Sequence, residues 1–410
     1  MVGAGIFALL GEAATVAGSA VWLSFLLSGT VAALLGYTVV KLGVRYPSSG
    51  GLIAYLVEGF GNGRLVGVAS WLGYFAAIVI VCSMVAVAFG SYATSLFLPD
   101  ATWGGWDNVF TTAIVLAMVA INIVGSRVVD RAQSLIVVVL LAVFAVFIAV
   151  TIIDIDPDLL AFSGYPPVFD IVASVALTFF AYLGFSVISF AAGDLRDPAR
   201  ELPRATYVAL GVTTLVYVLI ALGVFGTLTV EQAIGYGETA IAEAARPALG
   251  EAGFVMMAVA ALLATASTVN ASLYASGGLT ATLAEVGQFP PFFGRGSRLG
   301  PHAGVLITAA IVLVVSNVVD LGAIASVGSA CSLMVFMLVG IAGYRLRAET
   351  GSRAAIVVTA IVLVFFAIDT AQNAPQTFAA IVVIASLCVV LDLVWKRIRG
   401  AAEPSASQAS

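Results

Sequence analysis

The chain has 410 residues, of which 61% are hydrophobic and 10% are charged, and its formal net charge is −5. An ordinary water-soluble domain carries about 25% charged residues, so this composition excludes a soluble globular protein. One histidine and three cysteines, all inside apolar runs, argue against a zinc site or a disulfide framework. With a net negative charge, the sequence shows no basic patch of the kind that binds nucleic acid. We expect no cofactor, no metal centre and no nucleic-acid partner.

Apolar runs of roughly 20 residues, the length that crosses a bilayer as an α-helix, recur along the whole chain. Because strict alternation of apolar and polar residues is absent, a helical protein is predicted and not a barrel. The run at 229–250 is polar and acidic, which indicates a segment outside the membrane. The twelve predicted spans are 2–19, 21–44, 65–97, 109–125, 133–153, 168–193, 205–227, 252–284, 303–318, 321–344, 354–370 and 377–395.

The basic and acidic residues of the connecting loops fall on opposite sides of the membrane. If the spans alternate, 16 of the 17 basic residues fall on one side, and Arg246 is the only basic residue on the acidic side. The positive-inside rule assigns the basic side, and with it the C-terminus, to the cytoplasm. We therefore expect a multi-pass protein of the cell membrane, with the lipid bilayer as its surroundings.

Two segments contain residues that an uninterrupted helix avoids: 3–7 (GAGIF) in the first span and 179–185 (FFAYLGF) in the sixth. They lie five spans apart, so a second unit of five helices would enter the membrane from the opposite side. Interruptions at corresponding positions indicate an inverted-repeat transporter with discontinuous helices. Freed N–H groups at a half-helix start suit an anion, and freed carbonyls suit a cation. The pattern predicts a zwitterion receptor. Glycines that only allow close helix packing are the alternative.

Four motifs, in order along the chain, resemble those of the amino acid–polyamine–organocation superfamily. Residues 3–7 (GAGIF) are similar to the G-[SAT]-G-I-F motif of its first helix, and residues 46–51 (YPSSGG) to its R-x-P-x-S-G-G loop. Residues 180–185 (FAYLGF) and 197–205 (DPARELPRA) resemble its sixth helix and the loop that follows. Residues 285–290 (EVGQFP) resemble the segment after its eighth helix. The chain is therefore identified as an amino acid permease of this superfamily.

The resemblance implies an all-α polytopic membrane protein of the leucine-transporter type, with an inverted repeat of five plus five helices and two added helices. The repeats would span residues 1–155 and 165–347, followed by the two C-terminal helices at 352–398 and a disordered tail at 399–410. The resemblance also implies secondary active transport of amino acids by alternating access, and no enzymatic activity.

By the same resemblance, the substrate carboxylate meets backbone at the first break and its amino group meets carbonyls at the second, with aromatic rings nearby. The residues so assigned are Ala4, Gly5, Ile6, Phe180, Ala181, Tyr182 and Phe185. Tyr74 and Ser186 are further candidates for lining the pocket. Plain apolar packing is the alternative for the aromatic side chains.

The departures from the family pattern bear on substrate and coupling. Ser186 stands where relatives that recognise arginine or agmatine carry a carboxylate, so neutral, apolar L-amino acids are favoured. A polyamine or cationic amino acid exchanger and a non-transporting amino-acid-binding receptor are the alternatives. Leu140 stands where proton-coupled relatives have a lysine. Hydroxyls of Thr265, Ser267 and Thr268 offer oxygen ligands to sodium, unless they bond their own helix carbonyls. Sodium or proton coupling, exchange and facilitated movement stay open.

Two further features concern the first span. Glu12 is a carboxylate well within it, and an intramembrane charge indicates function or a solvated vestibule. The break at residues 3–7 stands almost at the start of the chain. A first helix that begins on the cytoplasmic side and breaks in the middle of the membrane should have half a helix before the break. Because the preceding Met-Val pair resembles internal sequence of that helix, we expect about 15 or more residues of half-helix upstream.

Overall fold

The computed structural model of the chain describes residues 4–47, 51–61, 63–100, 102–124, 127–188, 195–294, 296, 300–346 and 352–402. Within these ranges the chain forms helices and turns, and no strand. Gly3 of the first motif and residues 48–50 of the second lie outside the described ranges.

The helices of the first half are α1 (Ala4–Ala17), η1 (Gly18–Ala20), α2 (Val21–Arg45), α3 (Gly51–Phe60), α4 (Arg64–Tyr74), η2 (Phe75–Ile80), α5 (Val81–Phe97), α6 (Trp106–Val124), α7 (Arg127–Ile153) and η3 (Phe162–Gly164). Those of the central part are α8 (Val168–Phe179), η4 (Phe180–Tyr182), α9 (Gly184–Val187), α10 (Pro198–Phe225), α11 (Val230–Tyr236), η6 (Gly237–Thr239), α12 (Ala240–Glu243) and α13 (Arg246–Glu285). The last are η7 (Pro291–Phe293), η8 (Gly300–His302), α14 (Ala303–Val318), α15 (Leu321–Leu346), α16 (Arg353–Asn373) and α17 (Pro375–Ala402).

Ten helical segments in the described ranges are long and apolar enough to cross a membrane, against the twelve spans predicted. The first, Ala4–Arg45, contains both α1 and α2, because only the short turn η1 separates them. The helix α14 is apolar but has 16 residues, which is short for a bilayer crossing. The prediction of an all-helical polytopic membrane protein is confirmed, while helix length alone supports ten crossings.

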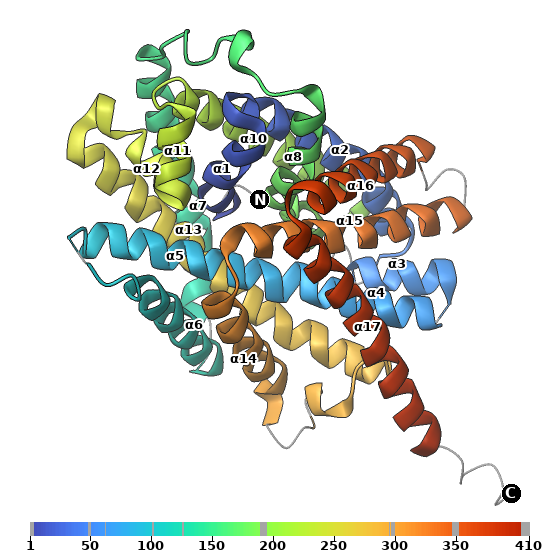
Figure 1. Cartoon of the computed structure of the whole chain (residues 1–410). Coiled ribbons are helices and arrows are strands. Elements are labelled where there is room, and N and C mark those ends of the chain that lie inside the picture. Colours follow the sequence, from blue (N-terminus) through green and yellow to red (C-terminus); the bar gives the residue numbers. More distant parts are fainter. Residues whose placement is uncertain are drawn as a thin grey trace, which may run out of the picture.

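The long helices pack side by side around a buried centre (Figure 1). The helices α5 and α15 cross the middle of the molecule, α11 and α12 lie at one end, and α17 runs along the outside toward the C-terminus. The helix α1 packs against α8, α5, α11 and η6. Ten of its 14 residues are buried, which is the behaviour of a helix that is apolar on every side.

Hydroxyl groups join α2 to α8 inside this core. Ser24 Oγ lies 2.5 Å from Ser174 Oγ, and Ser28 Oγ lies 2.6 Å from Thr178 Oγ1. Ser28 also donates to the carbonyl of Val175 at 3.0 Å. Small hydroxyl residues let membrane helices approach closely and hydrogen-bond to each other, so these pairs fix α8, and with it the segment η4, against α2.

The predicted run 65–97 forms one continuous segment, Arg64–Phe97, of 34 residues. Its middle is not α-helical throughout, since Phe75–Ile80 form a π-helix. A π-helical turn inserts one residue into the helical repeat and is found frequently at functional sites. Ile80, at the end of this turn, contacts α15 near the candidate site described below.

A buried ion pair within α17 lies against the start of α4, and its contacts there anchor α17 to α4. The Asp392 carboxylate, 1% exposed, lies 3.0 Å from the Lys396 ammonium, which also donates to the carbonyl of Gly63 at 3.1 Å. A Cβ at Gly67 would collide with Asp392 Oδ1 and lie 2.7 Å from its Cγ. Gly67 therefore provides the notch that receives the carboxylate. The sequence interpretation missed this intramembrane charge: Lys396 stands only four residues away, but Gly63 and Gly67, which complete the site, stand more than 300 residues away.

Lys396→Met is expected to destabilise the protein by about 2 kcal/mol, because it leaves the Asp392 carboxylate buried without a counter-charge. The loss is smaller than the roughly 3–5 kcal/mol of a fully buried pair, since the Lys396 side chain is 29% exposed. Thermal unfolding in detergent measures the effect, with Arg64→Met as the surface control. The double variant Lys396→Met/Asp392→Asn should recover much of the stability; a double variant less stable than Lys396→Met would contradict the pairing.

Candidate substrate site

The structure brings the residues of the two predicted helix breaks into direct contact, although residues 4–7 of the first form regular α-helix at the start of α1. A Cβ added to Gly5 of α1 would lie 2.8 Å from the Cα of Ala181 and 3.0 Å from its Cβ. These distances are shorter than side chains tolerate, so the backbones of α1 and η4 can approach this closely only because residue 5 is glycine. Ala4, Ile6, Phe180 and Ala181 are all buried around this contact.

The second break is a 3₁₀ turn, not a fully unwound segment. The helix α8 ends at Phe179, and Phe180–Tyr182 follow as η4, closed by a 3.2 Å bond from the Leu183 N–H to the Phe180 carbonyl. A 3₁₀ turn is tighter than an α-helix and changes which carbonyls are bonded within the helix. The carbonyl of Ala181 accepts from the Tyr217 hydroxyl at 3.5 Å.

The hydroxyl of Tyr182 fixes the turn from its other side. It donates to the carbonyl of Phe25 at 2.9 Å, and its ring meets the Tyr217 ring edge-on at 5.4 Å between centroids. Tyr182 is fully buried, so its side chain supports the turn. The turn is therefore held by α2 and α10 together.

The aromatic side chains of Phe180 and Phe185 pack against α15. A Cβ at Gly328 would collide with the ring of Phe180, and would lie 2.6 Å from Ile80 Cγ2. The ring of Phe185 stacks on that of Phe336, with 5.0 Å between the centroids. Gly328 was missed by the sequence interpretation, because one glycine among the small residues of residues 326–332 carries no distinguishing signal.

Tyr74 and Ser186 make their described contacts elsewhere. The Tyr74 hydroxyl hydrogen-bonds Thr308 at 2.8 Å, and its ring packs among aromatic side chains. Those side chains are Trp71, Phe75, Phe289 and Phe293. Ser186 donates to the carbonyl of Leu183 at 2.8 Å. Tyr74 thus belongs to an aromatic cluster of α4, η2 and the segment 289–293 and bonds to Thr308 of α14, while Ser186 lies directly beyond η4.

The hydroxyls predicted for sodium face their own helix. Thr265 donates to the carbonyl of Ala261 at 2.7 Å, and Thr268 donates to that of Ala264 at 2.8 Å. Ser267 is buried on the same helix, α13. Hydroxyl oxygens that donate in this way keep lone pairs for a cation, so the geometry permits both interpretations.

Leu140 lies on α7, the helix that packs its Phe144 ring against Phe7 of α1. Leu140 is buried on α7, and Phe144, one turn further, packs its ring 5.3 Å from that of Phe7 on α1. An apolar side chain at residue 140 matches these surroundings, where an unpaired ammonium would be costly.

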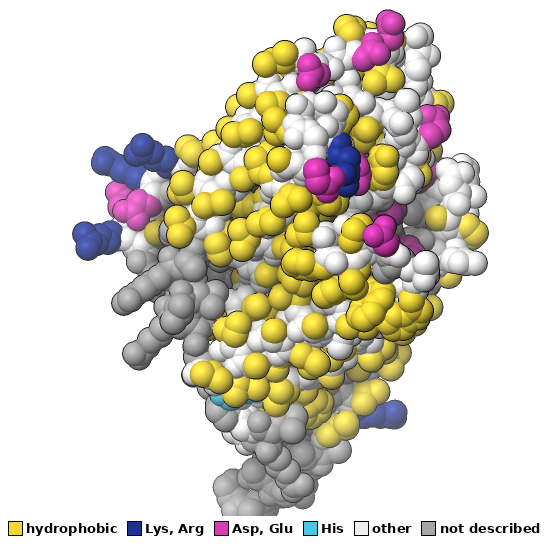
Figure 2. All heavy atoms as spheres, turned by 90° about the vertical axis from the view of Figure 1, so that its left-hand side faces the viewer, with side chains coloured by type: hydrophobic (Ala, Val, Ile, Leu, Met, Phe, Trp, Pro, Cys, Tyr) yellow, Lys and Arg dark blue, Asp and Glu magenta, His cyan; other side chains and the backbone are white. Residues whose placement is uncertain are grey.

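The far end of α1 is covered by the segment between α10 and α13. A Cβ at Gly11 would collide with the carbonyl oxygen of Gly237 and lie 2.7 Å from its carbonyl carbon. The Glu12 carboxylate lies against Gly322, with Glu238 and Asp320 within electrostatic range. Figure 2 shows this end of the molecule, where acidic side chains gather among hydrophobic ones.

Glu238→Gln is expected to raise the melting temperature near pH 7. Burial and the nearby Asp107 raise the pKa of the Glu238 carboxyl above its usual 4.5. The folded protein therefore binds this proton more tightly than the unfolded chain does, and ionisation weakens the folded state above the raised pKa. The gain of the variant should vanish as the pH falls to about 4.5. Glu231→Gln, on exposed α11, is the control; equal gains from both variants would contradict the assignment.

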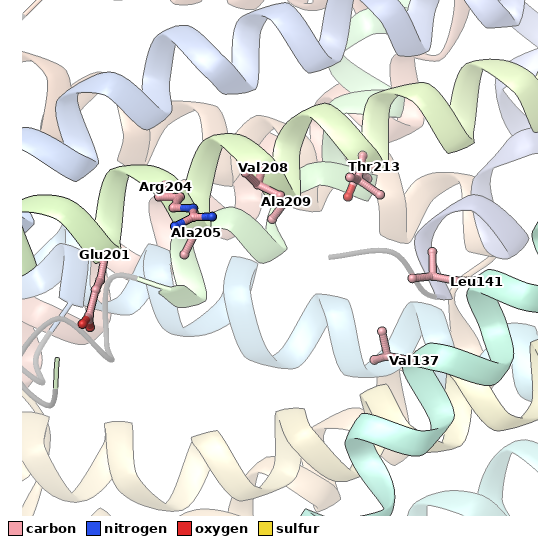
Figure 3. A pocket seen from close by; sticks show the side chains of 9 residues that line it. Val137, Leu141, Glu201, Arg204, Ala205, Val208, Ala209 and Thr213 are labelled. Atoms are coloured by element: carbon pink, nitrogen blue, oxygen red, sulfur yellow. The ribbon is translucent and has the colours of Figure 1, made fainter. Parts of the chain in front are cut away.

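A groove of about 560 Å³ runs between α7 and α10 (Figure 3). Apolar side chains of α10 face Val137 and Leu141 of α7 across it, and Glu201 and Arg204 lie at one end. The hydroxyl of Thr213, at the other end, is buried without a described hydrogen-bond partner. The predicted site residues do not line this groove.

Comparison of the sequence with known proteins identifies the family of the chain. The sequence profile described as amino acid permease matches residues 1–391. The inner membrane transport protein YbaT of Escherichia coli is 33% identical over 347 residues, which cover 85% of this chain and 80% of that protein. The methylthioribose transporter of Bacillus subtilis is 28% identical, over 85% of this chain and 78% of its own length. The serine/threonine exchanger SteT of Bacillus subtilis is 26% identical, over 71% of this chain and 66% of its own.

The profile match extends over almost the whole chain, so it includes the residues of both predicted helix breaks, nine of the ten candidate membrane spans in full and most of the tenth. The family implies a fold of the leucine-transporter type, and it is a family of transporters and not of enzymes. The chain is thus a multi-pass membrane protein and belongs to the amino acid permease family of the amino acid–polyamine–organocation superfamily.

Proposed function

We propose that this permease transports neutral, predominantly apolar L-amino acids across the cell membrane by alternating access. The observation that carries the proposal is the contact between Gly5 and Ala181, where the first turn of α1 and the 3₁₀ turn η4 meet at backbone distance. One substrate molecule placed beside this contact would reach the N–H groups of the first turn of α1 and the carbonyls of η4. A zwitterion matches both, because helix starts attract anions and a carbonyl oxygen that accepts one hydrogen bond keeps a second lone pair for a cation.

The surroundings of this contact favour an apolar side chain on the substrate. Phe180 adjoins Ala181 in η4 and meets Ile80 at Gly328, Phe185 follows three residues after Tyr182, and all three side chains are at most 4% exposed. No acidic side chain appears among the described contacts of Phe180 and Phe185. An ammonium-bearing side chain would lose its hydration without gaining a counter-charge, so cationic amino acids and polyamines are disfavoured.

The inverted repeat gives this site its place in the transport cycle. In our proposal helices of residues 1–155 and 165–347 form the two repeats. The two C-terminal helices lie at 352–398, and the basic side of the protein, with the C-terminus, faces the cytoplasm. Alternating access then exposes the same backbone site to either side in turn.

Coupling by exchange, by sodium or by facilitated movement fits the pocket better than a lysine proton switch. Leu140 leaves helix α7 without that ammonium, and the described contacts around Phe7 and Phe144 are apolar. Thr265, Ser267 and Thr268 remain the sodium candidates. Uptake driven by a proton gradient alone, without sodium and without internal substrate, would contradict this part of the proposal.

Uptake by proteoliposomes with a labelled panel tests the function. The panel contains leucine, serine, lysine, putrescine and methylthioribose, the last because a relative bears that name. Leucine uptake well above that of lysine and putrescine is expected. Uptake confined to the cationic compounds would overturn the proposed specificity, and saturable binding without flux would indicate a receptor.

A further inference from the structure

A second groove, of about 550 Å³, opens on the outer surface between α2, α10 and the start of α16. Its lining residues are Thr30, Ala33, Leu34, Tyr37, Tyr207, Ser352 and Arg353. The first five belong to membrane-spanning segments, and the last two begin another. The groove therefore faces the bilayer along most of its length.

The walls of the groove are apolar and its rim is aromatic. Ala33 and Leu34 are partly exposed within it, and Tyr37 and Tyr207 are 37% and 41% exposed. In a membrane, apolar surface that protein does not cover is covered by lipid, since water in such a groove would be unfavourable. Tyrosines with one wet and one apolar end are typical of the level of lipid headgroups.

Two cations and a hydroxyl stand at the end of the groove that bears the basic loops. The Lys41 ammonium lies 5.6 Å from the centroid of the Tyr37 ring, one turn along α2. The Arg353 guanidinium covers the Tyr344 ring, and its Nε donates to the Tyr344 hydroxyl at 3.0 Å. A guanidinium has five N–H donors, so several remain for an anion.

Ser352 adds a donor beside Arg353. Its Oγ accepts from the N–H of Ala355 at 3.2 Å, as the N-cap of α16. The hydroxyl hydrogen is then free to point away from the helix toward an acceptor. Among the described residues that line the groove none is acidic, so the charge at this end is positive.

We propose that the groove binds one anionic glycerophospholipid of the leaflet on the basic side of the protein. Its phosphate lies between Arg353, Ser352 and Lys41, and one acyl chain follows Leu34, Ala33 and Thr30 toward the middle of the membrane. The charge fits an anionic lipid and not a zwitterionic one, because each basic residue near the surface favours anionic headgroups by about fivefold in binding.

Such a lipid bridges elements that are distant in sequence. Tyr37 and Tyr207 bring α2 and α10 to the groove, while Ser352 and Arg353 bring α16. Occupancy holds the start of α16 against α2 and α10, and so stabilises the folded protein by an amount that rises with the logarithm of lipid concentration above Kd.

The test compares retained lipids by native mass spectrometry of the delipidated, full-length protein. Phosphatidylglycerol and phosphatidylcholine with identical acyl chains are added at equal concentration. We expect phosphatidylglycerol to be retained in preference, Arg353→Gln and Lys41→Gln each to reduce that preference about fivefold, and Arg64→Gln, a basic residue of α4, to leave it unchanged. Equal retention of the two lipids, or an equal loss with Arg64→Gln, would overturn the proposal.

Two further arms separate the acyl chain from the headgroup. Ala33→Trp fills the apolar wall without changing charge and is expected to remove both the retained lipid and the rise in melting temperature that phosphatidylglycerol produces. Inorganic phosphate alone should produce no such rise. If phosphate alone stabilised the protein as strongly, the site would recognise a free anion and not a lipid, and the proposal would be wrong.

Discussion

Gly5→Ala is expected to abolish the thermal stabilisation that substrate gives to the protein in detergent. The added methyl would lie 2.8 Å from the Ala181 Cα, so it would push α1 and η4 apart and displace the backbone groups that the proposed substrate meets. Wild-type protein at a substrate concentration of about 100 times Kd should gain about 2.7 kcal/mol from binding. The variant should gain nothing at that concentration.

Gly211→Ala is the matched control, because among the described residues no atom lies within 4 Å of a Cβ at Gly211. Gly29, a glycine of α2, is less suitable, since a Cβ there would meet the side chain of Thr214. If Gly5 serves only helix packing, Gly5→Ala lowers the melting temperature without substrate but keeps the substrate-dependent rise. A preserved rise would contradict the backbone receptor.

Gly11→Ala should be the most destabilising of the single-methyl changes, by about 3 kcal/mol. Its Cβ would collide with backbone atoms of Gly237, which cannot yield by changing a rotamer. Gly237 itself has φ of 53°, a conformation that L side chains rarely adopt. The segment Val230–Glu243 would have to move away from α1 as a unit.

Thermal unfolding in detergent checks this result, with Gly235→Ala as the control in the same segment. Among the described residues, a Cβ at Gly235 has no atom within 4 Å, so that variant should unfold at the wild-type temperature. A Gly11→Ala protein as stable as Gly235→Ala would show that the segment does not rest on α1.

Much of the fold follows from the hydrophobic pattern, because a bilayer demands long apolar helices with internally satisfied backbone. The run 168–193 predicted the helix that contains η4, and the phenylalanine- and glycine-rich sequence predicted its interruption. Length was the weaker criterion: η1 is too short to separate α1 from α2 in a count of spans, and α14 is short for a span.

The contacts between distant helices could not be read from the sequence. Gly67 receives Asp392, Gly328 receives Phe180, and Gly11 receives Gly237. In each pair the informative residue is a glycine, whose only signal is the absence of a side chain, and membrane helices contain many glycines for packing alone. The pair Gly5 and Ala181 was accessible only because both partners stand in recognisable motifs.

The most direct measurement of the central claim is the affinity for end-blocked substrates. The best amino acid of the uptake panel is compared, by substrate-dependent melting temperature, with its methyl ester and with its N-acetyl derivative. A receptor that binds both ends through backbone groups at Gly5 and Ala181 predicts that each derivative binds about 10–100-fold more weakly, because each loses a hydrogen bond to a charged group. If the methyl ester and the N-acetyl derivative both stabilised the protein as well as the free amino acid, the zwitterion site at the two helix breaks would be contradicted.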